Sequence, residues 1–106
     1  MLIKRYVDLI TNVLSKYIES EIRTMGFFDD SDNTDNILYL CLIEAERIVG
    51  EIGNSIIEAS DIAILAERKI LKLLNNKYHL LETYDSYGYK TRIFSNEVPI
   101  TRPFLE

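Results

Sequence analysis

Apolar residues recur at intervals of three and four positions through most of the sequence, and this spacing limits what the chain can fold into. The pattern is longest over residues 2–24, and Gly26 is placed to stop a helix there. A polar run follows and ends in Thr34 and Asp35, either of which can cap a second helix over residues 36–51. Its apolar opening predicts a helix that neighbouring elements cover on every side.

A third amphipathic helix is predicted to begin after Ser55, where a capping box is spaced correctly, or after Ser60, and to end near Glu82. Beyond it the helical period disappears. Residues 90–94 could form a short strand, and the prolines hold residues 98–104 extended. These elements predict an all-α fold, a three-helix bundle-like subunit with an irregular or short-β loop and an extended C-terminal tail.

The length of 106 residues allows a single domain. We expect a helical core over residues 1–83, with an interface loop and tail over residues 84–106. A chain this short has a thin core, so a partner or a second copy often adds stability. The longest apolar run, residues 37–43, is far too short to span a bilayer, and no signal-peptide pattern is present, so no membrane role is expected. Cys41 lies within that run and is expected to be a buried, inert thiol.

Charge is distributed unevenly along the chain. Residues 1–25 carry a net charge of +1, residues 26–61 carry −8, and residues 62–106 carry +2. An acidic middle and a mildly basic end suit head-to-tail contact between copies or docking on a charged partner, although solvated helix faces would give the same balance. The absence of a dominant basic stripe argues against simple nucleic-acid binding.

The C-terminal fifth of the chain interleaves aromatic and arginine residues, the types that protein interfaces prefer. Alternatively, this segment folds back and covers its own helices. The predicted interface residues are Tyr84, Tyr87, Tyr89, Arg92, Phe94, Pro99, Arg102 and Phe104.

Candidate catalytic and metal sites are weak. A catalytic triad needs a base beside its nucleophile. The only histidine, His79, is predicted to lie inside the third helix as a surface or packing residue. No cofactor or catalytic residue is expected. The acidic run does not match an EF-hand in either frame we tested, which leaves a loose cation site or a solvated loop. Glu58 and Asp61 have one of the two carboxylate spacings by which all-α nucleotide pyrophosphohydrolases hold magnesium, but the first pair is missing.

One further pattern lies in the order of the elements. An acidic turn leads into a helix over residues 35–48, and a short Gly/Asn break precedes a longer helix over residues 63–78. An irregular loop and an extended tail, Glu97-Val-Pro-Ile, follow. This layout resembles the small head–tail connector (head-completion adaptor) proteins of tailed bacteriophages and prophages, over residues 35–105. The chain departs from them in lacking the usual proline before the long helix and in its long first helix.

The resemblance implies a structural subunit without enzymatic activity. Such subunits form a homo-oligomeric ring between the portal protein and a tail-side neck or stopper protein, in the virion neck after assembly in the host cytoplasm. DNA would pass through the ring without specific binding. Acidic side chains in the channel would repel DNA phosphates, and the candidates are Asp29, Asp30, Asp32 and Asp35. A magnesium-dependent pyrophosphohydrolase and a small non-phage adaptor remain the alternatives.

Overall fold

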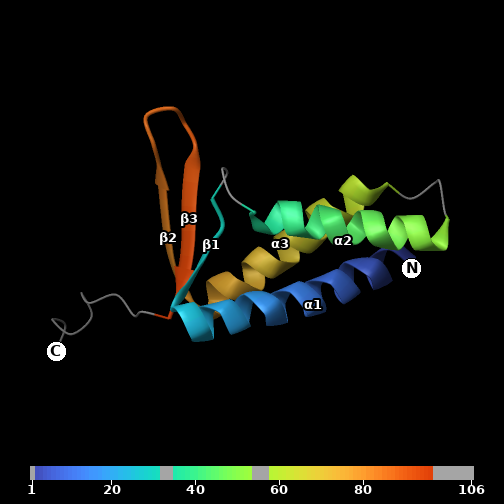
Figure 1. The fold of residues 1–106 in the computed structure, drawn as a ribbon, viewed down its shortest axis with the longest axis horizontal. Coiled ribbons are helices and arrows are strands. Elements are labelled where there is room, and N and C mark those ends of the chain that lie inside the picture. The colour runs from blue at the N-terminus through green and yellow to red at the C-terminus, as the bar shows by residue number, and fades with distance from the viewer. Residues whose placement is uncertain (1, 32–34, 54–57, 97–106) are drawn as a thin grey trace, which may run out of the picture.

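The computed structural model describes residues 2–31, 35–53 and 58–96, which form three helices and a three-stranded sheet. Helix α1 spans Leu2–Met25, α2 Ile37–Ile52 and α3 Ala59–Lys77. Strands β1 (Phe27–Asp29), β2 (His79–Tyr84) and β3 (Lys90–Ser95) form an antiparallel sheet in the order β1-β3-β2. The helices lie together, and the sheet stands across one end of them (Figure 1). None of the described helices is long and apolar enough to cross a membrane.

The prediction of three helices is confirmed, but the prediction of an all-α fold is wrong, because a strand between α1 and α2 joins two strands after α3 in a sheet. Gly26 ends α1 with a φ of 91°, and its N–H donates to the carbonyl of Ile22, so the chain turns directly into β1. The third helix ends at Lys77 rather than near Glu82. His79 is therefore the first residue of β2 and not part of a helix.

The core is built mainly from the buried stripes of the helices. Phe94 of β3, in register with Phe28 of β1 and Leu80 of β2, brings the inner face of the sheet into this core. The largest fully buried side chains, which come from all three helices and the sheet, are Ile10, Ile18, Ile22, Ile37, Cys41, Ile62, Ile70, Leu74 and Phe94.

Helix α2 is not covered on every side, contrary to the prediction from its apolar opening. Ile37 and Cys41 face the core, but Tyr39 and Ile43 are between two-fifths and half exposed. The thiol of Cys41 is buried as expected, and burial raises its pKa to about 12, which leaves it protonated and unreactive.

Candidate protein interface

The loop between β2 and β3 has a fixed conformation. The N–H of Gly88 donates to the carbonyl of Asp85 over 3.1 Å, which closes a tight turn, and Gly88 has a φ of 88° that other residues rarely adopt. One carboxylate oxygen of Asp85 accepts from the N–H groups of Tyr87 (2.8 Å) and Tyr89 (2.9 Å). Asp85 therefore determines how the loop presents its tyrosines.

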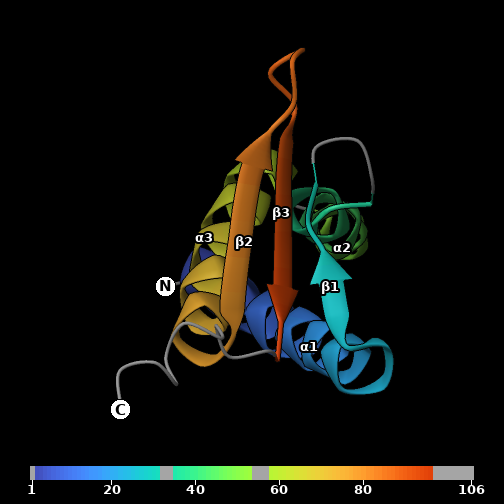
Figure 2. The same cartoon turned by 90° about the vertical axis from the view of Figure 1, so that its left-hand side faces the viewer.

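Three of the predicted interface residues lie in or next to the loop that joins β2 to β3. Tyr84 is 64% exposed, Tyr87 86% and Tyr89 56%. The hairpin tip projects well beyond the helices in both views (Figures 1 and 2), so the tip meets solvent rather than its own core. Exposed tyrosines on an ordered tip lose little conformational freedom when a partner covers them.

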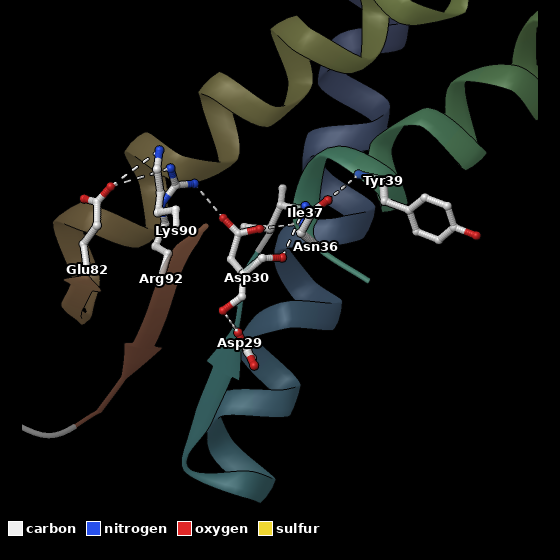
Figure 3. Close-up of polar contacts among 9 residues, drawn as sticks. Asp29, Asp30, Asn36, Ile37, Tyr39, Glu82, Lys90 and Arg92 are labelled. Carbon is white, nitrogen blue, oxygen red and sulfur yellow. Dashed lines mark hydrogen bonds and ion pairs between the residues drawn. The ribbon is translucent and has the colours of Figure 1, made fainter. Parts of the chain in front are cut away.

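The outer half of the hairpin is held by charged contacts across its two strands. The ammonium of Lys90 lies 5.8 Å from the centre of the Tyr84 ring and 3.6 Å from a carboxylate oxygen of Glu82. The same oxygen lies 3.9 Å from the guanidinium of Arg92. Figure 3 shows Glu82 between Lys90 and Arg92.

Arg92, also predicted as an interface residue, instead contacts its own chain. Its guanidinium nitrogen lies 2.6 Å from the carboxylate of Asp30, and the two side chains are only 15% and 3% exposed. The second oxygen of Asp30 accepts from the N–H of Ile37 over 2.7 Å, at the first residue of α2 (Figure 3). The pair therefore ties β1 and β3 to the start of a helix.

Phe94 also faces inward, with 1% of its surface exposed, so it cannot contact a partner while the chain is folded. Arg92 and Phe94 were both predicted as interface residues because the composition of this stretch does not reveal that this part of β3 packs against its own chain. The remaining predicted interface residues, Pro99, Arg102 and Phe104, lie outside the described residues.

The structure separates the four predicted channel carboxylates. Asp29 is half-buried in β1 and accepts a hydrogen bond from the Ser31 hydroxyl, whereas Asp35 is exposed before α2. Asp30 is buried in its pair with Arg92 and cannot line a channel. Burial raises the pKa of Asp30, against the opposing effect of the hydrogen bonds from Ile37 and Arg92. Asp32 lies outside the described residues.

The weak magnesium candidates are not joined by further ligands. Glu58 is the residue before α3, and Asp61 lies in the first turn of that helix; both are exposed. Within the described residues, no three His, Cys, Asp or Glu side chains are grouped so that they could hold a metal ion.

Residues 83–89 have the composition of a turn, and residues 90–94 were predicted as a possible short strand, but the pairing of that strand with residues 79–84 was not predicted. The roles of Asp85, Glu82 and Lys90 in holding the hairpin are therefore visible only in the structure.

The partly buried Glu67 on α3 predicts that the free energy of unfolding depends on pH. Its partial burial, with Asp30 nearby, raises its pKa, so the folded chain releases this proton at a higher pH than the unfolded chain does. The contribution of Glu67 to the free energy of unfolding therefore falls as the pH rises from the pKa of its carboxyl in the unfolded chain to the higher pKa in the folded chain. Glu67→Gln should be more stable relative to the wild type at pH 7 than at pH 4, measured by urea unfolding. The exposed Glu46→Gln is the control, and an equal Glu67→Gln difference at both pH values would contradict the assignment.

Comparison of the chain with protein-family models, curated proteins and solved structures finds no match.

Proposed function

We propose that this chain is a structural subunit that acts by assembly, forming a homo-oligomeric ring. The observation that carries the proposal is the hairpin tip, which presents Tyr84, Tyr87 and Tyr89 to solvent from a conformation fixed by Asp85. Tyrosine is enriched among the residues that contribute most to binding energy, and a fixed loop loses little entropy on binding. A chain with a small core gains stability from such contacts.

The charge pattern supports contact between copies. The strongly acidic middle of the sequence and its mildly basic ends give unlike surfaces, which favour heterologous contacts; these close into a ring when the rotation between neighbours fits. The hairpin tip, close to the basic Lys90, would meet a more acidic surface on the neighbour.

The specific ring that we propose is the head–tail connector of a tailed phage or prophage, with the portal protein on one side and a tail-side neck protein on the other. The support is the order and spacing of the helices over residues 35–78. DNA would pass without specific binding, and Asp29 and Asp35 are the described carboxylates that could repel its phosphates. The chain would reside in the virion neck after assembly in the host cytoplasm.

Affinity purification of the tagged full chain from its native source tests this function. The wild type should recover portal and tail-side proteins, identified by mass spectrometry. Tyr84→Ser/Tyr87→Ser/Tyr89→Ser should fold but lose them, because its tip no longer offers apolar area to a neighbour.

Tyr17→Ser/Tyr39→Ser is the matched control. It removes two tyrosines that are each 49% exposed on helices and should retain the partners. Equal recovery by wild type and the triple variant would contradict the role of the hairpin. Recovery of one unrelated host protein instead of a portal would contradict the connector.

A further inference from the structure

The outer face of the sheet carries an apolar hollow that the tyrosine tip does not include. Residues on alternating positions point away from the helices, and they bring Phe27, Leu81 and Ile93 together from all three strands. With Met25, these side chains form the apolar part of a hollow of about 540 Å³, whose other lining residues are Gly26, His79, Ser95 and Asn96. In Figure 2 the three strands lie in front of the helices, and none of the described helices covers this face.

The side chains of the hollow are unusually exposed for their type. Phe27 is 45% exposed, Leu81 51% and Met25 63%. Exposed apolar side chains that are grouped on the open face of an antiparallel sheet favour coverage by a protein segment over contact with water.

The position of the C-terminal segment identifies that occupant. The described chain ends at Asn96, on the border of the hollow, and ten further residues follow. They include four large apolar residues, Val98, Ile100, Phe104 and Leu105, and one cation, Arg102. Eight residues, 98–105, would extend about 26 Å, enough to cross the sheet along a six-residue strand.

The charge of the hollow's surroundings matches this segment. Asp29 is paired with Ile93 in the sheet register and alternates with the inward Phe28, so its carboxylate lies on the outer face. A segment that places Phe104 or Ile100 in the hollow can bring Arg102 towards that carboxylate.

We propose that this hollow binds residues 98–105 of a second copy of the chain. The second copy is favoured over the chain's own tail because Pro99 and Pro103 restrict the residues before them to extended conformations. To reach its own hollow, the segment would have to reverse direction directly after Asn96, whereas a neighbouring copy can lay an extended segment across the hollow without a turn. The inference rests on the proposed self-assembly and adds a second contact to it, in which each copy donates a tail and accepts one.

Cross-linking of full-length variants tests the proposal. Thr101→Cys, which leaves Ile100 and Phe104 in place, is mixed with Leu81→Cys and treated with a short bis-maleimide, which joins two accessible thiols. Cys41 does not interfere, because it is fully buried and its pKa is raised to about 12. Val13→Cys replaces Leu81→Cys in the control, since Val13 has the same 51% exposure but lies on α1.

The cross-linked dimer should form at least about tenfold faster with Leu81→Cys than with Val13→Cys, since burial of one large apolar side chain favours binding by that factor or more. Equal rates, or no dimer with either variant, would overturn the proposal. So would a Leu81→Cys/Thr101→Cys chain that links to itself as a monomer in excess wild type, because the chain's own tail would then fill the hollow.

The solution mass of the same samples separates the two proposals. If the untreated chain is oligomeric but Leu81→Cys shows no preference, the tail inference fails and assembly stands. If the chain is monomeric at every concentration, the proposed function fails with it.

Discussion

Asp30→Ala should lower the free energy of unfolding by about 3 kcal/mol, because it leaves the largely buried guanidinium of Arg92 without its main partner. It also removes the acceptor for the N–H of Ile37 at the start of α2. Folded domains are stable by about 0.05–0.15 kcal/mol per residue, so this loss is a large part of the total for so small a chain. Urea unfolding followed by circular dichroism measures it.

Two further variants separate the contributions within this pair. Asp30→Asn keeps an acceptor for Ile37 but loses the charge, so it should cost less than Asp30→Ala. Asp30→Leu/Arg92→Met replaces the ion pair with apolar side chains and should recover much of the loss. Asp35→Ala removes a nearby exposed carboxylate as the control. If Asp30→Ala costs no more than Asp35→Ala, Asp30 does not join the sheet to α2 as described.

Phe94→Ala should destabilise the chain by about 3–5 kcal/mol, the usual cost of removing a fully buried aromatic ring. The ring lies on the central strand between Phe28 and Leu80, and it packs in the same core as the helices. Its loss leaves a cavity at the place where the sheet joins the helices. The midpoint of thermal or urea unfolding measures the effect.

Tyr87→Ala provides the contrast for this substitution. It removes an aromatic ring from the same hairpin, but from a position that is 86% exposed, so it should leave stability of the single chain within about 0.5 kcal/mol. If Phe94→Ala reduced assembly and left the unfolding midpoint unchanged, Phe94 would be an interface residue, as sequence analysis predicted, and not a core residue.

The helices could be predicted from the sequence because each carries its own periodic signal. The first helix was placed over residues 2–24 and extends one residue further, to Met25, since Gly26 stops it locally. Of the sheet, only a possible short strand over residues 90–94 was predicted, and it corresponds to β3. Its strands are short and lie far apart in the chain, and β1 has only three residues, so no local pattern announces the pairing of Phe28 with Phe94.

The end of the third helix shows how tertiary contacts override a local pattern. Tyr78 and Leu81 continue the helical spacing, yet the chain leaves the helix at Tyr78 and pairs six residues of β2 with β3. The same pairing decides the candidate interface. Residues grouped by composition are divided by their place along the hairpin: Phe94 and Arg92 lie where the sheet packs on the rest of the chain, and the tyrosines lie at the exposed tip.

The most direct test of assembly is the mass of the untagged full chain in solution, measured by native mass spectrometry and by sedimentation across a range of concentrations. The account predicts one closed oligomer whose mass is a whole-number multiple of 12.3 kDa, and its loss in Tyr84→Ser/Tyr87→Ser/Tyr89→Ser. A single species of 12.3 kDa at every concentration would contradict it.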